Sequence, residues 1–248
     1  MGQEKKNIDY WTEENNLEWY IRQFREPYRI TVAFEKFLAV NTDLDHKKIL
    51  DIGCGPGSGT SYFAQKHLSS SFTGIDINTK LFDLYQGTSG NIQFQYGDVF
   101  NLDHTLTNQF DGIISLQTLS WLPEYRGPIE QMCKLNPNWI AFSSLFYEGS
   151  INYTISLENY GKPTKESDFS QVYYNIYSVP KITELFADYG YGNVKYAPFE
   201  IDIDISRPDH KNLGYYTVNT TDGKRLAFNT CLYQPEGFFF ASKGKQYE

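Results

Sequence analysis

The residues best suited to bind a ligand lie together in Lys47–Thr60, which reads KKILDIGCGPGSGT. Asp51 lies in a short apolar run that predicts a β-strand, and the residues from Ser58 predict the start of a helix. Strand, glycine turn and helix form the opening unit of nucleotide-binding α/β sheets. Glycine suits such a turn because a Cβ would keep the backbone away from a ligand. The turn has glycines at alternate positions, which are Gly53, Gly55, Gly57 and Gly59.

The spacing of these glycines argues against a phosphate ligand. A P-loop needs a Gly-Lys-Ser/Thr ending, which is absent. The dinucleotide pattern G-x-G-x-x-G also fails, because its last glycine would fall on Ser58 or Thr60. The carboxylate of Asp51 would repel a pyrophosphate but would attract an ammonium group. S-adenosylmethionine carries both an ammonium and a sulfonium, so it fits this turn better than a dinucleotide.

A second acidic residue follows the next predicted strand. Ser71–Asp76 reads SFTGID, and Asp76 follows the glycine turn at about the ~20-residue offset where a carboxylate reaches the two ribose hydroxyls of a nucleotide. We expect the next residue, Ile77, to lie against the adenine ring, with plain core packing as the alternative. We also expect Asn78 to cap a helix over residues 79–86.

Four short motifs, LDIGCGPG, TGID, YGD and FDGIISL, occur in this order between residues 47 and 146. Together they resemble the class I S-adenosylmethionine-dependent methyltransferases, and the aromatic segments around them are similar to the small-molecule type. The resemblance implies an α/β fold. It has a Rossmann-like, seven-stranded sheet with an antiparallel last strand, and S-adenosyl-L-methionine is the cofactor, leaving S-adenosyl-L-homocysteine as product.

The resemblance also implies which residues hold the cofactor. In the family pattern, Asp98 would accept a hydrogen bond from the adenine amino group, and the N–H of Val99 would meet a ring nitrogen. Leu116 and Gln117 would flank the methyl group at the end of the fourth strand. The cofactor-binding residues expected in this way are Asp51, Gly53, Cys54, Gly55, Gly57, Asp76, Ile77, Asp98, Val99, Leu116 and Gln117.

Four segments of a single domain are expected to place these residues. Residues 1–46 should form N-terminal helices that cover the cleft and break at Pro27, and residues 47–146 should form the cofactor-binding core. Residues 147–178 are rich in aromatic side chains and predict a cap inserted after strand five. Residues 179–248 should complete the sheet with a strand over 193–205 and a last strand over 238–242, and add a hairpin that turns at Asp222-Gly223. The core should also contain a helix over residues 123–135.

The acceptor is less defined than the cofactor. The sequence lacks the Asn/Asp-Pro-Pro-Tyr/Phe motif of nucleic-acid base methylases and the acidic cluster of magnesium-dependent catechol-type enzymes. We therefore expect methyl transfer to an oxygen or nitrogen of a small molecule, such as a sugar or a phosphorylated amine. Candidate acceptor-binding residues are Arg25, Tyr28, Trp121, Tyr147 and Tyr177. The chain has 20 Tyr and 18 Phe, so core packing is the alternative for each aromatic residue.

No catalytic base is identified by a motif. Two of the four histidines, His104 and His210, could approach the cleft, but neither has a motif around it. Arg22, Arg25 and Arg29 recur at helical spacing, which predicts either a basic stripe over the cleft or a solvated helix face. Two other functions stay open: a methyltransferase-like protein that binds the cofactor without turnover, and a nicotinamide-dependent oxidoreductase.

Composition narrows the class of protein. The 248 residues include 22 basic and 30 acidic side chains, giving a net charge of −8, which disfavours a nucleic-acid partner. Three scattered cysteines, Cys54, Cys133 and Cys231, form neither a disulfide framework nor a metal site. No apolar run approaches membrane-spanning length. We expect a cytoplasmic protein without a membrane span or bound metal, either monomeric or homodimeric.

Overall fold

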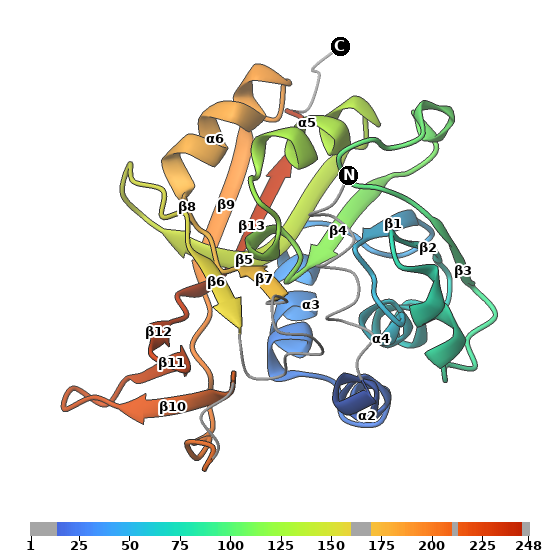
Figure 1. Ribbon diagram of the computed structural model, residues 1–248. Helices are drawn as coiled ribbons and strands as arrows, with labels where there is room; N and C mark the ends of the chain where they lie inside the picture. Colours follow the sequence, from blue (N-terminus) through green and yellow to red (C-terminus); the bar gives the residue numbers. More distant parts are fainter. Residues whose placement is uncertain (1–13, 160–169, 210–212, 245–248) are drawn as a thin grey trace.

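A central β-sheet organises the computed structural model, which describes residues 14–159, 170–209 and 213–244 (Figure 1). Its strands lie in the order β3-β2-β1-β4-β5-β13-β9, and a short strand, β8, pairs with β5 beside this path. Their bounds are β1 Lys48–Ile52, β2 Ser71–Asp76, β3 Ile92–Tyr96, β4 Gly112–Leu116, β5 Trp139–Tyr147, β8 Ile176–Ser178, β9 Asn193–Pro198 and β13 Glu236–Ser242.

The strand directions match the sheet expected from the sequence. Strands β1 to β5 pair in parallel, whereas β13 runs antiparallel to both β5 and β9. The prediction of a seven-stranded Rossmann-like sheet with an antiparallel last strand is confirmed. Because β13 is antiparallel, its first residue, Glu236, lies beside Leu145 near the carboxyl end of β5. The start of β13 therefore belongs to the edge where ligands bind in open α/β sheets.

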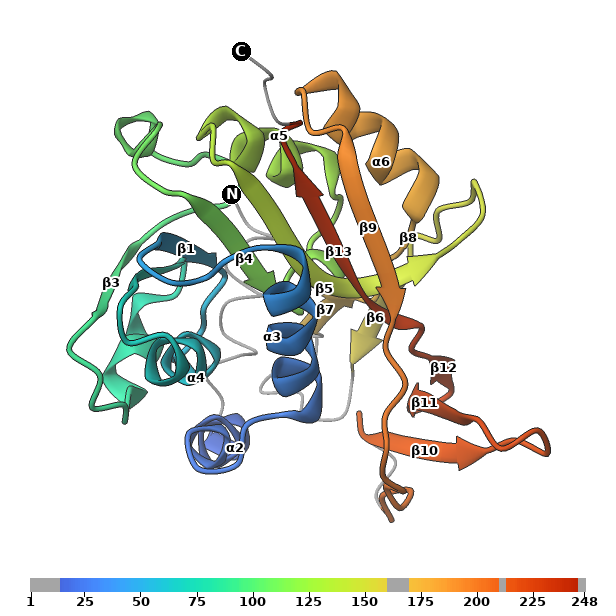
Figure 2. The same ribbon diagram turned by 180° about the vertical axis from the view of Figure 1, so that it is seen from behind.

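Helices cover both faces of the sheet (Figure 2). On one face lie α3 (Arg29–Asn41) and α4 (Ser58–Lys66), and on the other lie α5 (Arg126–Lys134) and α6 (Val179–Asp188). Helix α3 buries Ile30, Phe34 and Leu38 against the first face because these residues recur three and four positions apart. On the second face, α5 and α6 pack around Phe142 and Phe239. This three-layer arrangement holds the strand ends rigidly in register.

Three additions lie at the same end of the molecule, where β4 ends and β13 begins (Figure 1). They are helix α2 (Glu14–Gln23), the hairpin of β6 (Ser156–Asn159) and β7 (Ser170–Tyr173), and a small sheet. The small sheet contains β10 (Tyr215–Asn219), β11 (Arg225–Asn229) and β12 (Leu232–Tyr233). The predicted hairpin turn is confirmed, since Gly223 has φ +83° between β10 and β11.

Several predicted element bounds differ from the structure. The strand expected over residues 193–205 ends at Pro198, because β13, with which it pairs, begins at Glu236 and offers no further residue for pairing. The helix expected over 79–86 is a 3₁₀ helix, η1 (Thr79–Leu84), and the helix expected over 123–135 is shorter, beginning at Arg126. The last strand begins at Glu236, two residues before its predicted start. The break near Pro27 is confirmed, because α2 ends at Gln23 and α3 begins at Arg29.

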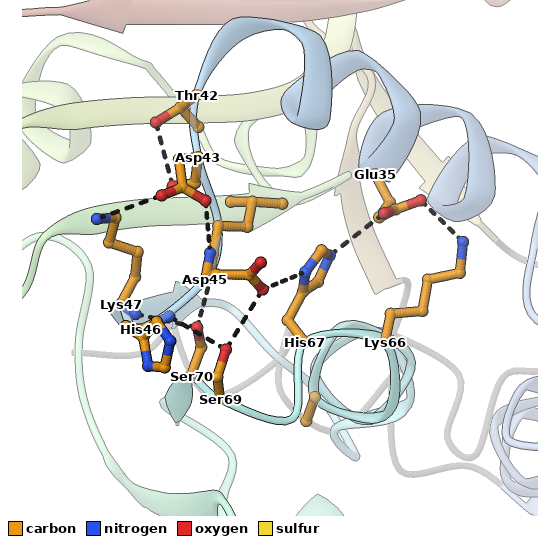
Figure 3. Close-up of polar contacts among 12 residues, drawn as sticks. Glu35, Thr42, Asp43, Asp45, His46, Lys47, Lys66, His67, Ser69 and Ser70 are labelled. Atoms are coloured by element: carbon orange, nitrogen blue, oxygen red, sulfur yellow. Dashed lines mark hydrogen bonds and ion pairs between the residues drawn. The ribbon is translucent and has the colours of Figure 1, made fainter.

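A polar network fastens α3 to the opposite, amino end of the sheet (Figure 3). The buried carboxylate of Glu35 accepts from Lys66 Nζ at 3.0 Å and lies 3.2 Å from His67 Nε2. On its other side, His67 Nδ1 lies 3.9 Å from Asp45 Oδ1 in the loop before β1. The Glu35 carboxylate lies between the Lys66 ammonium and the His67 ring, so the network holds α3 against the end of α4. It lies away from the edge where ligands bind.

Candidate functional site

The glycine turn between β1 and α4 adopts backbone angles that only glycine enters without strain. Gly53, Gly55 and Gly57 have φ of +72°, +55° and +82°. A Cβ on Gly53 would collide with the side chain of Thr118, and a Cβ on Gly57 would collide with the ring of Phe94. A Cβ on Gly55 would meet no atom within 4 Å. The middle of the turn therefore borders open space, which is the arrangement a bound ligand requires.

Asp51 lies directly behind this turn and has unused hydrogen-bonding capacity. Its side chain is 1% exposed, and Oδ2 accepts a hydrogen bond from the Thr60 hydroxyl at 2.6 Å. The buried Oδ1 has no hydrogen-bond partner among the described residues. Burial raises the pKa of Asp51 to about 7, although the bond from Thr60 partly offsets the increase. An ammonium group of a ligand would supply the partner that Oδ1 lacks.

Asp76 ties the end of β2 to the same turn. Its Oδ2 accepts from the backbone N–H of Gly55 at 2.9 Å, and its Oδ1 accepts from the N–H of Asn78 at 2.8 Å. Burial raises the pKa of the Asp76 carboxyl, and these backbone bonds oppose that increase. Each oxygen keeps a second lone pair for another donor, such as a ribose hydroxyl. Asp76 thus fixes the position of Gly55 and also lies at the edge where a ligand would bind.

Asn78 differs from its predicted role. The sequence predicted that Asn78 would cap the next helix, but its side chain makes no capping hydrogen bond. It is 6% exposed, and its buried Nδ2 has no hydrogen-bond partner in the part of the chain that the structure describes. An unpartnered buried amide is uncommon. Together with Asp51 Oδ1, it gives the site two polar atoms that a ligand could satisfy.

Cys54 contributes its backbone to the turn and its side chain to the core. Its N–H donates to Ile75 O at 3.1 Å. Its thiol packs beside Gly74, since a Cβ on Gly74 would lie 2.8 Å from Cys54 Sγ. Burial raises the pKa of the thiol, which keeps it protonated and unreactive. The expected contact of Cys54 with a cofactor would therefore come from its backbone.

The residues after β2 and β3 lie side by side. Strands β2 and β3 pair through Asp76 and Tyr96, which places Asp98 just beyond the end of β3. Asp98 Oδ1 accepts from the N–H of Phe100 at 2.9 Å, and Val99 packs against the core. Ile77 is exposed at the same edge. Asp98 thus stabilises its own turn and retains acceptor capacity for a further donor.

The end of β4 places Gln117 beside the glycine turn. Gln117 has φ +53°, and its N–H donates to Ser143 Oγ at 2.9 Å on the neighbouring strand β5. Leu116 packs against the start of α4 near Gly59, while Thr118 packs against Gly53. The left-handed backbone at a residue other than glycine is strained, which is common at functional sites. The segment expected to flank the methyl group therefore lies next to the turn.

Gln117 also leads to a functional candidate that the sequence analysis missed. Its Nε2 donates to Glu236 Oε1 at 3.2 Å, and the hydroxyl of Tyr215 donates to Glu236 Oε2 at 2.8 Å. Glu236 is 9% exposed, and burial raises its pKa to about 7. The available signal was a glutamate directly preceding the apolar run GFFFA, which makes it the first residue of a buried strand.

Helix α2 packs over the beginning of α4. The hydroxyl of Ser58 donates to Gln23 Oε1 at 3.1 Å. The ring of Phe24, just after α2, meets Tyr85 edge-on with centroids 5.7 Å apart, and Tyr85 meets Phe94 behind Gly57. The end of α2 and the residue after it therefore contact the start of α4 and the aromatic side chains behind the glycine turn.

The basic stripe expected from three arginines is not present. Arg22 is in α2, Arg25 follows its end, and Arg29 begins α3, so the three do not share one helix. Arg22 pairs with Glu26 at 2.7 Å, and Arg29 pairs with Asp202 at 2.7 Å. Arg25 is exposed. The helix break at Pro27 interrupts the periodicity that predicted the stripe.

The aromatic candidates for acceptor binding have different environments. Tyr28 directly precedes α3 and is partly buried, and burial raises the pKa of its hydroxyl. Trp121 packs on Tyr174 with centroids 4.3 Å apart, whereas Tyr147 is 42% exposed at the end of β5. Tyr177 is buried, and its hydroxyl lies within hydrogen-bonding distance of the carbonyl oxygens of Leu119 and Leu122 after β4. Its position therefore favours a structural role.

The histidines give no obvious catalytic base. His104 begins the short 3₁₀ helix η2 (His104–Leu106) and is exposed, while His67 belongs to the network of Figure 3. His210 lies outside the described residues.

No helix in the described part of the chain is long and apolar enough to cross a membrane.

Comparison with known proteins adds independent findings. Residues 49–135, from β1 to the end of α5, match a family described as a methyltransferase domain. A fatty-acid O-methyltransferase from Mycolicibacterium smegmatis is 26% identical over 99 residues, which cover 39% of this chain and 36% of that protein. A phthiotriol/phenolphthiotriol dimycocerosates methyltransferase from Mycobacterium leprae is 29% identical over 102 residues, covering 40% of this chain and 37% of that protein.

A likeness in structure extends over nearly the whole chain. The crystal structure of magnesium protoporphyrin IX methyltransferase from Synechocystis PCC 6803, with bound S-adenosylmethionine, has a TM-score of 0.53 and 16% identity. The likeness covers 98% of this chain and 95% of that chain. It shows a common fold, whereas the sequence matches span little more than a third of the two curated relatives.

Proposed function

We propose that this protein, whose residues 49–135 form a class I methyltransferase domain, transfers a methyl group from S-adenosylmethionine to a small molecule. The observation that carries the proposal is the glycine turn. Gly55 borders open space while the buried Oδ1 of Asp51, directly behind the turn, has no partner among the described residues. A ligand with an ammonium group matches both features.

The residues at the carboxyl edge fit each part of this cofactor. Asp51 would hold the ammonium, Asp76 the ribose hydroxyls and Asp98 the adenine amino group, with Ile77 and Val99 beside the ring. Gly53, Gly55, Gly57 and the backbone of Cys54 would border the amino-acid part, and Leu116 and Gln117 the methyl group. The bound cofactor supplies a methyl group already activated by a sulfonium. The protein then needs chiefly to hold an acceptor in line with it, which can contribute on the order of 7 kcal/mol.

We propose that the acceptor has an apolar part. The two curated relatives are named for lipid substrates, a fatty acid and phthiotriol dimycocerosates, and the structural relative for a protoporphyrin. In this chain, the end of β5 and the described part of the segment after it expose three large apolar side chains, Tyr147, Ile151 and Tyr153. Two of the three arginines that could attract a phosphorylated amine are already ion-paired. These observations favour an amphiphilic acceptor over a sugar or a phosphorylated amine.

A turnover assay tests this function. The full chain would be incubated with methyl-labelled S-adenosylmethionine and decanol, decylamine, decanoic acid, protoporphyrin, glucose or phosphoethanolamine, and labelled product would be measured. We expect product with at least one apolar acceptor and none with glucose or phosphoethanolamine. Product only with the polar pair would contradict the proposed acceptor class. Tight cofactor binding without any product would favour a protein that binds the cofactor and does not turn over.

A further inference from the structure

We infer that Glu236, oriented by Gln117 and Tyr215, receives the proton that the acceptor loses during methyl transfer. The inference rests on the proposed function and names the reacting group of the acceptor as a hydroxyl or an amine. Among the predicted cofactor contacts, the Gln117 side chain is the one that reaches this buried carboxyl.

Glu236 lies where an acceptor must approach. It begins β13 beside Leu145 of β5, at the carboxyl edge of the sheet. Gln117, at the end of β4, spans β5 to reach it and lies next to the residue that packs on the glycine turn. The Gln117 side chain thus connects Glu236 to the end of β4, one residue before Thr118, whose side chain packs on Gly53. A group held at the end of β4 would lie between the cofactor turn and this carboxyl.

The carboxylate of Glu236 is held in one orientation but can accept further hydrogen bonds. Oε1 accepts one bond from Gln117 and Oε2 accepts one from Tyr215, at 3.2 and 2.8 Å. A carboxylate can accept about four hydrogen bonds, so capacity remains for an acceptor O–H or N–H. Tyr215 comes from β10, and this bond fastens the small sheet of β10 to β12 to the edge of the main sheet. Gln117 and Tyr215 are therefore positioning residues for Glu236.

The surroundings make Glu236 suitable for accepting a proton near neutral pH. The groups that face its carboxyl are the amide of Gln117 and the phenol of Tyr215, while β5 and β9 place Leu145 and Pro198 beside the start of β13. No cation pairs with the carboxylate among the described residues. Burial raises the pKa of Glu236 to about 7, and the two hydrogen bonds limit the increase. A base whose pKa lies near the working pH is the most effective.

The proposed step balances in atoms and charge. The acceptor oxygen or nitrogen forms a bond to the methyl carbon, and the bond between that carbon and sulfur breaks with its electron pair left on sulfur. The acceptor's own proton moves to the carboxylate of Glu236, which becomes neutral. The methylated acceptor and S-adenosylhomocysteine are the products, and Glu236 later returns the proton to water.

This chemistry distinguishes acceptor classes. A carboxylate acceptor has no proton to lose, and near Glu236 it would meet a like charge in a place of low dielectric constant. A hydroxyl or an amine would instead donate a hydrogen bond to Glu236 before it reacts. We therefore expect this chain to prefer an alcohol or amine over a carboxylic acid with the same apolar chain, unlike the relative named for fatty acids.

The test compares Glu236→Gln, Tyr215→Phe and the exposed control Glu200→Gln. S-adenosylhomocysteine binding is measured first by calorimetry, and we expect all three variants to bind within about twofold of the wild type, because none contacts the cofactor. Turnover is then measured with decanol, decylamine and decanoic acid. Glu236→Gln should lose about 100-fold or more in kcat, with little change in KM for S-adenosylmethionine, and Glu200→Gln should lose nothing.

The pH profile separates a proton acceptor from a structural residue. At saturating S-adenosylmethionine, wild-type turnover should fall as the pH decreases below about 7, because Glu236 then holds a proton. Tyr215→Phe removes a bond that stabilises the carboxylate, so the fall in its turnover should begin at higher pH than in the wild type. A residue that only supported the fold would not move the profile. Thermal unfolding of each variant identifies any loss that comes from misfolding.

The experiment separates failure of the role proposed for Glu236 from failure of the proposed methyltransferase function. If wild-type protein does not bind S-adenosylhomocysteine, both proposals fail. If it binds, the role of Glu236 alone is overturned by turnover of Glu236→Gln equal to wild type or by an unshifted profile in Tyr215→Phe. Preference for decanoic acid, or no turnover with any of the three probes, would equally overturn it. Preference for decanol or decylamine with loss in Glu236→Gln supports it.

Discussion

Asp51 shows how burial prepares a single residue for a charged ligand. Its carboxyl lies behind the glycine turn with one oxygen bonded to Thr60 and the other without a partner in the described part of the chain. The cost of burying a charge there raises its pKa to about 7. A cationic ligand would offset that cost, so ligand binding and loss of the proton should be coupled.

The first prediction follows from this coupling. Below pH 7 the free protein holds a proton on Asp51, and an ammonium ligand favours the carboxylate, so S-adenosylhomocysteine binding should release close to one proton at pH 6. Affinity should fall by about tenfold for each pH unit below 7. Calorimetry in buffers of different ionisation enthalpy measures this release. Asp51→Asn should bind without releasing a proton, and equal proton release by that variant would contradict the prediction.

Asp76 carries the second prediction. Asp76→Ala should weaken S-adenosylhomocysteine binding by roughly 1.5–3 kcal/mol, because it removes a charged acceptor for the ribose hydroxyls and loosens Gly55. Asp103→Ala is the matched control. Asp103 is exposed and accepts a backbone N–H at the start of η2 in a similar way, but it lies outside the site. Calorimetry should find unchanged affinity in the control, and unchanged affinity in Asp76→Ala would show that the ribose is held elsewhere.

At the scale of elements, the glycine turn and the β10–β11 turn provide a direct comparison. Gly55 and Gly223 both have left-handed backbone angles, and a Cβ on either would meet nothing within 4 Å. Alanine at either position should cost about 1–2 kcal/mol of unfolding free energy from strain. Only Gly55→Ala should also weaken S-adenosylhomocysteine binding, because its methyl group enters the ligand's space. Equal affinity of both variants would place the ligand away from the turn.

The network that fastens α3 should affect stability and not binding. Glu35→Ala leaves Lys66 and His67 without their shared partner and should lower the free energy of unfolding by about 1–3 kcal/mol. Lys36→Ala on the exposed side of the same helix should change it little. Urea unfolding measures the difference. A loss of S-adenosylhomocysteine affinity in folded Glu35→Ala would contradict the assignment of this network to the amino end of the sheet.

Sequence reasoning succeeded where the information was local. The glycine turn and the hairpin at Gly223 each depend on a few adjacent residues, and the hairpin is confirmed. The sheet is confirmed as well, but it was implied by the resemblance of four motifs to a known family. Reasoning from the residues alone failed where distant residues meet. Glu236 and Gln117 are 119 positions apart, and only the antiparallel direction of β13 brings them together. Asn78 was expected to cap a helix because the type of residue fits, but burial of its amide depends on the folded sheet.

Other differences have equally physical causes. The basic stripe required one continuous helix, which Pro27 interrupts. The strand expected over residues 193–205 required pairing beyond Pro198, where β9 ends. Aromatic composition predicted an acceptor cap after β5 but could not separate exposed Tyr147 from buried Tyr177. The division into four segments, the contacts of each site residue and the acceptor remain predictions for the experiments above.

In the described part of the chain, two layers of helices enclose the central sheet, and the three additions lie at one end of it. Helix α2, the β6–β7 hairpin and the small sheet of β10 to β12 come from separate parts of the sequence, yet all lie near the edge where β4 ends (Figure 1). The core fixes the turn and the strand ends, and we propose that the additions contact the acceptor. We therefore expect differences in acceptor preference among related chains to arise in these additions.

The most direct test of the central claim is a calorimetric titration of the full chain with S-adenosylhomocysteine beside a matched titration with NAD. We predict one molecule of S-adenosylhomocysteine bound per chain and no detectable binding of NAD. At 100 times its dissociation constant, the ligand should stabilise the fold by about 2.7 kcal/mol. Binding of NAD without binding of S-adenosylhomocysteine would contradict the account.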